Sequence, residues 1–494
     1  MKCKSNIIFV FSLFATVQIC LGQSQNMTLY ANPPKLSGEL FNDCWGYEAA
    51  NGEEFAIIGA RNAIRIYNVS DPRNPNSVYY RQDGSNTVWR DFKTYRNYVY
   101  GVCDNCNQGL QIICMDSLST TNFRRDNSKF NASHNIYIDT INARLYAVGA
   151  NYYLNGGSKN GIICYDISIP STPVFIGFFN QNVYYHDIWV ENHIAYASGE
   201  YSGNYIYNMT DVNNVGFITV NGDRTGYHHS STKHPSSPYL YSAREVPTGL
   251  PLTVYKKIGN SLISLSDFQE ALLSPVVTNS TPHNPYVHKG KLFVSYYHDG
   301  VLVFDLKDPA KPKRMAYYDT YPSNTNYSGY EGCWGVYPFF RSGTIIASDI
   351  IRGLFVLGLD VKVDFSQDFI LTTPGSGLVI KSKWASKKIT VDDSGNLITS
   401  NPPSPSSEPK IMFSDVKAGG NVVLTSLNGS TFRLVVDNAG VFSTQSVSNP
   451  SGTSISTDLI FDDINTGPLI VAPNNNTYRL DINQSSAITS FLKY

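Results

Sequence analysis

Four histidines stand at equivalent places along the chain and are the residues whose chemistry stands out. His134, His186, His229 and His283 each come where a strand is predicted to begin. In several of the repeats an acidic residue stands at or just after the second predicted strand; these residues are Asp104, Glu200, Glu245 and Asp349. Neutral imidazole binds zinc, iron, copper or nickel, and carboxylates can join it as ligands. The pattern predicts a site for one divalent metal ion, with these candidate ligands: His134, His186, His229, His283, Glu200 and Glu245.

A structural role for the same histidines is the alternative prediction. An imidazole at a repeated strand start can bond to the backbone carbonyl of the neighbouring repeat and hold the repeats together. Trp45, Trp89 and Trp334 fill the equivalent position elsewhere, which suits packing better than metal binding. The polar residues just after these openings are expected to orient the ligands or to join neighbouring repeats; they are Asp91, Asn135, Asp187 and Asn284.

No known catalytic signature accompanies the histidines in the sequence. The chain contains no GxSxG, HExxH or EF-hand pattern, and no glycine-rich phosphate loop before a predicted helix. We therefore assign no catalytic residue, and we favour a binding protein over an enzyme. Paired tyrosines such as Tyr184-Tyr185 and Tyr296-Tyr297 could present aromatic rings to sugars, although packing between strands explains them equally well.

The elements that must position these residues form an internal repeat. Residues 63–72, 161–170 and 300–309 each run from an apolar strand to a turn that contains proline. A second strand precedes each copy, and an opening residue, Trp or His, precedes that strand. The openings are 44, 45, 52, 43, 54 and 51 residues apart and comprise Trp45, Trp89, His134, His186, His229, His283 and Trp334. This spacing suits four-stranded sheets repeated around an axis, so the fold class is predicted to be all-β, a seven-bladed β-propeller.

A propeller must close, because each blade buries its two faces only against its neighbours. The last repeat shows three strands, and residues 26–31 before the first opening are predicted to supply the fourth. Cys44 and Cys333 precede equivalent tryptophans in the first and last repeats. A Cys44–Cys333 disulfide would lock this closure and contribute roughly 4–5 kcal/mol, with two buried free thiols as the alternative.

The C-terminal part follows a different pattern. Three similar units begin at Gly377, Gly420 and Gly467, and each leads to a second predicted strand. We predict a small all-β domain with approximate threefold repeats, trefoil- or prism-like. The predicted domains are a signal peptide over 1–22, the propeller over 23–365 and this repeat domain over 366–494.

The propeller part resembles the LVIVD-repeat propellers, and most closely the choice-of-anchor B family. The carrying segments include Trp89-Arg90-Asp91, Ser133-His134-Asn135-Ile136, Gly226-Tyr227-His228-His229 and Arg352-Gly353-Leu354-Phe355-Val356. The resemblance covers residues 27–360 in order and spacing. It implies a propeller outside the cytoplasm with a surface-attachment tail, and it implies no activity.

The N-terminus and the cysteines indicate secretion. Lys2 and Lys4 precede a short apolar stretch, which is typical of a cleaved secretory signal and too short to span a bilayer. Cys103 and Cys106 have the spacing of thiol-redox and metal sites, and we favour a small local disulfide loop over either. Nine Asn-x-Ser/Thr sequons permit glycosylation: Asn26, Asn68, Asn131, Asn208, Asn279, Asn326, Asn428, Asn475 and Asn483.

Together these observations predict a secreted binding or adhesion protein whose partner is an extracellular glycan or protein. The net charge of −1 argues against nucleic acid as a partner, and no transmembrane segment is predicted. Two alternatives stay open: a metal-dependent enzyme that uses the histidines, and a structural component of the extracellular matrix.

Overall fold

The structure is a computed structural model. It describes residues 23–359 except 84–85, 119–121, 222–224, 236 and 274–278. Beyond residue 359 it describes 368–371, 374, 377–381, 386–401, 416–417, 422–439, 441–448, 452–455, 459–461, 468–471, 477–482 and 488–492. The predicted signal peptide over 1–22 lies outside the described residues.

Strands dominate the described chain, and the strands of residues 24–359 form seven antiparallel sheets, here called blades 1 to 7. The first four blades in chain order are β3 (Phe41–Glu48), β4 (Glu54–Ala60), β5 (Ala63–Asn68) and β6 (Asn76–Gln82); β7 (Arg90–Tyr95), β8 (Tyr98–Cys103), β9 (Leu110–Cys114) and β10 (Phe123–Asp126); β11 (Asn135–Asp139), β12 (Arg144–Val148), β13 (Asn160–Asp166) and β14 (Val174–Tyr184); and β15 (Asp187–Glu191), β16 (Ile194–Ser198), β17 (Asn204–Asn208) and β18 (Gly216–Val220).

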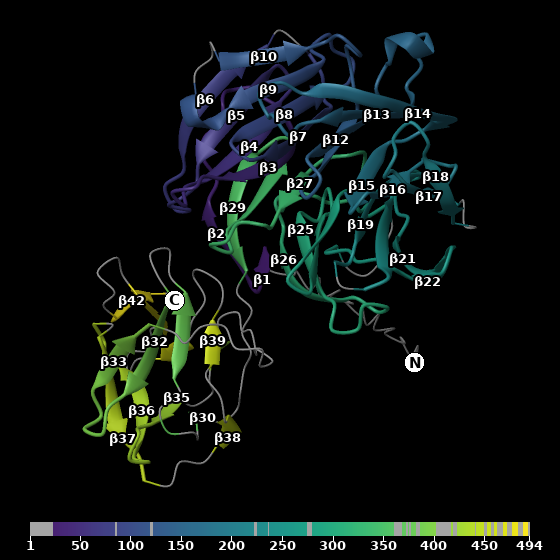
Figure 1. The fold of residues 1–494 in the computed structure, drawn as a ribbon. Coiled ribbons are helices and arrows are strands. Elements are labelled where there is room, and N and C mark those ends of the chain that lie inside the picture. The colour runs from purple at the N-terminus through teal and green to yellow at the C-terminus, as the bar shows by residue number, and fades with distance from the viewer. Residues whose placement is uncertain are drawn as a thin grey trace, which may run out of the picture.

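The last three blades complete a closed ring. They are β19 (His228–Lys233), β20 (Tyr239–Arg244), β21 (Leu252–Ile258) and β22 (Ser261–Phe268); β23 (Pro285–His288), β24 (Lys291–Ser295), β25 (Val301–Asp305) and β26 (Lys313–Tyr318), joined by β1 (Ser24–Gln25); and β27 (Cys333–Tyr337), β28 (Ile345–Asp349) and β29 (Gly353–Leu359), joined by β2 (Met27–Ala31). The inner strands of blades 1 to 6 contact one another in succession, β27 of blade 7 contacts β24 of blade 6, and β27 also contacts β3 of blade 1. The protein is therefore a β-propeller, as the sequence predicts (Figure 1).

Stacking of blades explains the burial of the strands. In blade 1 the central strand β5 is buried at Ala63–Tyr67 on both faces, whereas most residues of the outer strand β6 are exposed or half-buried. Apolar clusters lie between adjacent blades, so a single sheet would leave them open to water. One such cluster joins blade 7 to blade 1 through Val356, Ile346 and Ile58.

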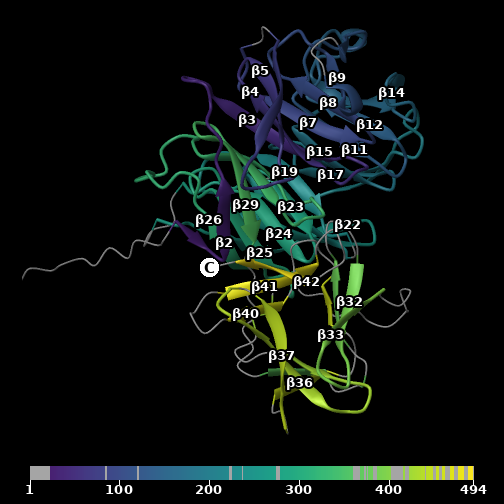
Figure 2. The same ribbon diagram turned by 90° about the vertical axis from the view of Figure 1, so that its left-hand side faces the viewer.

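The N-terminal strand closes the ring as predicted. Strand β2 pairs antiparallel with β29, with Met27 opposite Leu359 and Thr28 opposite Gly358. The purple β2 lies beside the green β29 in both ribbon views (Figures 1 and 2). The Met27 side chain is buried in the apolar cluster between blades 6 and 7. The short β1, which the sequence did not reveal, pairs with β26 of blade 6.

The predicted Cys44–Cys333 disulfide is absent, and both thiols are free and buried. The thiol of Cys333 turns to the carbonyl oxygen of Gly335 in its own blade, 3.5 Å away. Burial raises the pKa of both thiols well above the ordinary value. The closure therefore depends on strand pairing and apolar packing, and the alternative of two buried thiols is the one that the structure shows.

The C-terminal part has three further sheets (Figure 2). Each contains a three-stranded antiparallel unit: β31 (Leu378–Lys381), β32 (Ser386–Val391) and β33 (Leu397–Ser400); β35 (Val422–Thr425), β36 (Thr431–Val436) and β37 (Phe442–Ser446); and β40 (Pro468–Val471), β41 (Thr477–Ile482) and β42 (Ile488–Leu492). Parallel pairings add β39 (Leu459–Phe461) to β31, β30 (Asp368–Leu371) to β35, β38 (Gly452–Ile455) to β30, and β34 (Val416–Lys417) to β40. The three units share one apolar core, to which they contribute Ile380, Leu424 and Leu480 in turn.

The described residues also include two short 3-10 helices, Met115–Ser117 and Tyr153–Asn155. Within the same residues, no helix has the length and apolar character that crossing a membrane requires.

Candidate functional site

The four repeated histidines line one arc of the central channel. Successive ring centroids lie 4.0 Å apart from His134 to His186, 4.1 Å from His186 to His229 and 4.2 Å from His229 to His283. The indole of Trp334 continues the row, 5.0 Å from the His283 ring. The backbone fixes these positions, because the amide of His186 donates to Ser198 and that of His283 to Ser295, each at the end of the second strand of its blade.

Two of the histidines bond to the next blade, as the structural alternative predicts. Nδ1–H of His186 donates to the carbonyl oxygen of His229 at 3.1 Å, and Nδ1–H of His283 donates to that of Trp334 at 2.5 Å. A neutral imidazole that carries its proton on Nδ1 presents a lone pair at Nε2. The structural bonds therefore leave the second ring nitrogen of both histidines available as a ligand.

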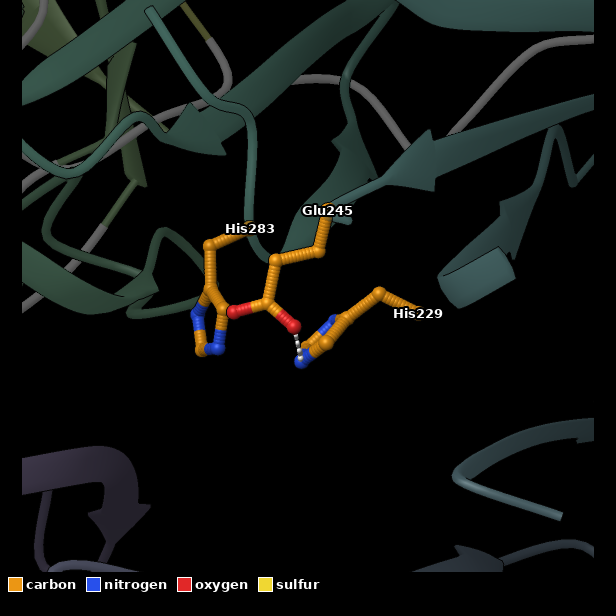
Figure 3. Close-up of side chains that lie close together, drawn as sticks. All are labelled: His229, Glu245 and His283. Atoms are coloured by element: carbon orange, nitrogen blue, oxygen red, sulfur yellow. Dashed lines mark ion pairs between the residues drawn. The ribbon is translucent and has the colours of Figure 1, made fainter. Parts of the chain in front are cut away.

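Glu245 completes a cluster with two of the histidines (Figure 3). One possible ligand atom from each of His229, Glu245 and His283 lies within 4.8 Å of the others. Nε2 of His229 is 3.7 Å from Oε2 of Glu245, while the Tyr297 hydroxyl donates to the other carboxylate oxygen at 2.7 Å. Among the described residues this is the one group of three or more potential ligands that lie so close together.

The remaining candidate ligands lie outside that cluster. Glu200 occupies the place in blade 4 that Glu245 has in blade 5, but its carboxylate accepts a hydrogen bond from the Tyr227 hydroxyl at 2.8 Å. His134 contacts Asp104 through Nδ1, 3.1 Å from the carboxylate. His186 lies beside His229 without joining the three-residue group. Asp349, which the sequence placed near the same mouth, is buried and accepts from the amides of Ile351 and Arg352.

Burial favours the neutral form of His186, His229 and His283, because it lowers the pKa of each. It lowers the pKa of His186 and of His229 well below the ordinary value, and the neighbouring imidazoles lower both further. Burial also lowers the pKa of His283 to about 3, although the hydrogen bond to the Trp334 carbonyl raises the pKa in part. For Glu245 burial raises the pKa, although the bond from Tyr297 opposes it. The site therefore presents neutral nitrogen donors to a carboxyl group that is poorly hydrated.

A second charged group lies at the other end of the histidine row. Lys159 and His134 both contact Asp104, and the Lys159 Nζ–Asp104 Oδ1 distance is 2.5 Å. Burial raises the pKa of Asp104, but the bonds from His134 and Lys159 outweigh it and lower the value to about 2. Asp104 lies between Cys103 and Cys106, which a disulfide joins. This small loop holds the carboxylate at the mouth of the channel.

A cavity of about 600 Å³ opens at this mouth. Aromatic side chains supply much of its lining, and charged groups stand among them. The lining includes Trp89, Tyr184, Tyr227, Tyr297, Tyr330, Trp334, Asp104, Lys159, His134, His186 and Glu245. The Trp89 side chain is 37% exposed and that of Tyr330 39%, so both rings are open to a ligand. The sequence pattern indicates the tyrosine pairs, but it gives no signal that Tyr330 and Lys159 line the cavity, because both lie in loops.

Polar residues fill the channel next to the histidines. Asp91, Asn135 and Asn284 line a small void together with the four histidines, and Asp187 lines the adjoining one with Lys93. Asp91 binds Lys93 Nζ at 2.6 Å and accepts from the Ile136 amide at 2.9 Å. Asp187 accepts from the Ile188 amide. These residues contact neighbouring strands or fill the channel, and whether they support a bound metal stays a prediction.

The sequons divide by exposure. Asn26, Asn208, Asn279, Asn326 and Asn428 are exposed. Asn68 and Asn131 are half-buried, and their side-chain amides bond to Glu53 and Tyr153. Asn475 and Asn483 lie outside the described residues.

The chain matches no family model and no curated protein. Among solved structures it is similar to the β-propeller domain of Cps50 (Swd1) from Myceliophteria thermophila. The TM-score is 0.47 and the identity 9%, over 66% of this chain and 99% of that one. Nothing about a ligand or partner follows from this likeness.

Proposed function

We propose that the protein is a secreted binding protein that takes an extracellular glycan into the cavity at the mouth of the channel. The carrying observation is the cavity itself, which combines open aromatic rings with charged groups on a rigid ring of blades. Its volume of about 600 Å³ lies within the roughly 300–1,000 Å³ typical of small-ligand sites.

The lining suits the two kinds of surface that a sugar presents. The C–H face of a sugar ring is apolar and packs on flat aromatic side chains such as Trp89 and Tyr330. The hydroxyl groups need donors and acceptors, which Lys159, Asp104 and Glu245 supply. A protein partner would need a larger contact area than this cavity offers, and binding of a protein alone is an outcome of the test below.

Secretion is part of the proposal and is supported by the sequence. The charged and apolar N-terminus, the Cys103–Cys106 disulfide and the five exposed sequon asparagines all suit an extracellular protein. Attachment to a surface through the C-terminal sheets would then place the propeller mouth outside the cell.

A glycan array with the full mature chain tests the binding function, followed by calorimetry on the strongest glycan. We expect Trp89→Ala and Tyr330→Ala to weaken binding at least tenfold each, because each removes an exposed ring of the cavity. Phe217→Ala is the matched control, since Phe217 is 61% exposed on the outer strand β18 of blade 4. Absence of any glycan signal, binding of a protein alone, or equal binding by all three variants would contradict the proposal.

A further inference from the structure

We propose that His229, Glu245 and His283 bind one divalent transition-metal ion, with zinc as the ion that best matches their donor atoms. The inference goes beyond the proposed function, because the ion needs no glycan to bind. The four-histidine pattern of the sequence is thereby narrowed to two histidines and one carboxylate from blades 5 and 6.

The distances allow an ion after a small movement of side chains. Two ligands of a tetrahedral zinc ion at about 2.0–2.1 Å lie about 3.4 Å from each other. The separation of 3.7 Å between His229 Nε2 and Glu245 Oε2 is already close to that value. The candidate atoms lie within 4.8 Å of one another, so closure requires each pair to approach by no more than about 1.4 Å.

Neighbouring groups already orient two of the three ligands. Nδ1–H of His283 is held by the Trp334 carbonyl, which leaves Nε2 unprotonated. The Tyr297 hydroxyl binds Oε1 of Glu245 and leaves Oε2 toward His229. Ligating histidines and carboxylates in metal proteins have hydrogen-bonded partners of this kind.

The Glu245 carboxylate is 15% exposed, and among the described residues its ion-pair partner is His229 rather than a lysine or arginine. Glu245 faces His229 at 3.7 Å, which is too long for a strong hydrogen bond. Burying a carboxylate without a paired positive charge is costly. A divalent ion between Glu245, His229 and His283 would supply that charge, and it would use the Nε2 lone pair that the bond to Trp334 leaves on His283.

The site would remain open to a further ligand. Two histidines and one glutamate leave at least one position free on a four-coordinate zinc ion, which is the pattern of exchangeable rather than closed zinc sites. Glu245 also lines the mouth cavity, so the ion would lie at its edge. A water molecule or an oxygen atom of a bound ligand could occupy the free position.

Titration of the metal-stripped, tag-free mature chain with Zn²⁺ by calorimetry tests the site. We expect one Zn²⁺ per chain and at least tenfold weaker binding in Glu245→Gln. Glu200→Gln is the matched control, because Glu200 has the equivalent place in blade 4 and a tyrosine partner, yet lies outside the cluster. The amide of Glu245→Gln can still accept from Tyr297, and circular dichroism checks that each variant folds.

Cobalt provides a second readout that does not depend on affinity. Co²⁺ in a four- or five-coordinate site with nitrogen and oxygen ligands gives visible absorption bands that are much more intense than those of aqueous Co²⁺. We expect these bands in wild type and Glu200→Gln and their loss in His283→Gln. Sub-stoichiometric Zn²⁺ in wild type, or equal affinities for wild type and Glu245→Gln, would overturn the proposal.

Discussion

Replacement of Lys93 by methionine tests the charge balance in the channel most directly. Lys93 Nζ lies 2.6 Å from Asp91 Oδ1, and the two side chains are 5% and 4% exposed. Asp43 and Asp187 also interact electrostatically with Lys93. One ammonium group therefore serves three carboxyl groups in a region that water scarcely reaches.

The expected loss of stability at pH 8 is about 3–5 kcal/mol, the usual cost of removing one partner of a buried ion pair. The loss should be smaller at pH 5. Burial raises the pKa of Asp187 to about 7, and Lys93 opposes that rise. Burial likewise raises the pKa of Asp43 well above its ordinary value, with Lys93 opposing.

The sign of the pH dependence follows from these shifts. A carboxyl group whose pKa is raised on folding stabilises the protein below its unfolded value, and that contribution is lost as the pH rises through the folded value. For Asp187 the window runs from about pH 4 to about pH 7. Without Lys93 both carboxyl groups retain protons to higher pH, so the stability of Lys93→Met should fall more steeply between pH 5 and pH 8 than that of wild type.

Urea unfolding followed by tryptophan fluorescence measures this difference at pH 5 and pH 8. Four of the five tryptophans, Trp45, Trp89, Trp189 and Trp334, belong to the blades or their openings. Lys307→Met, at an exposed lysine, is the matched control and should change stability by less than about 0.5 kcal/mol. Lys93→Met with Asp91→Asn should recover part of the loss. A loss below about 1 kcal/mol at pH 8, or an equal loss at both pH values, would refute the reasoning.

Two further predictions concern ring closure and the cysteines. Met27→Ala should lower the free energy of unfolding by about 2–5 kcal/mol, because Met27 is 4% exposed between blades 6 and 7. Leu29→Ala is the control on the same strand and should cost much less, because Leu29 is 37% exposed. Equal effects of the two variants in urea unfolding would contradict closure of the ring by β2. After alkylation in denaturant without reductant, peptide mapping should find Cys44 and Cys333 alkylated and Cys103 joined to Cys106. Alkylation of the native protein should leave Cys44 and Cys333 unmodified, because both are buried. A peptide that contains a Cys44–Cys333 disulfide would contradict the structure.

The sequence by itself determined the repeat and its closure. Opening residues at regular spacing, apolar strands and turns are local patterns, and each depends on neighbours within one blade. Residues 26–31 could be assigned to blade 7 because a ring of stacked sheets leaves one vacant outer position. The placement of the histidines around one channel followed from the same symmetry.

Only the tertiary structure decided which side chains meet. Glu200 and Glu245 stand at equivalent positions, yet the first contacts Tyr227 and the second approaches His229. Cys44 and Cys333 belong to adjacent blades, yet their thiols remain free. Tyr330 and Lys159 reach the cavity from loops without repeat symmetry. The physical reason is that the repeat assigns each strand to its blade and sets the path of the backbone there. Side-chain rotamers and loop conformations, which set distances of a few ångströms, depend on contacts between blades that no local sequence pattern records.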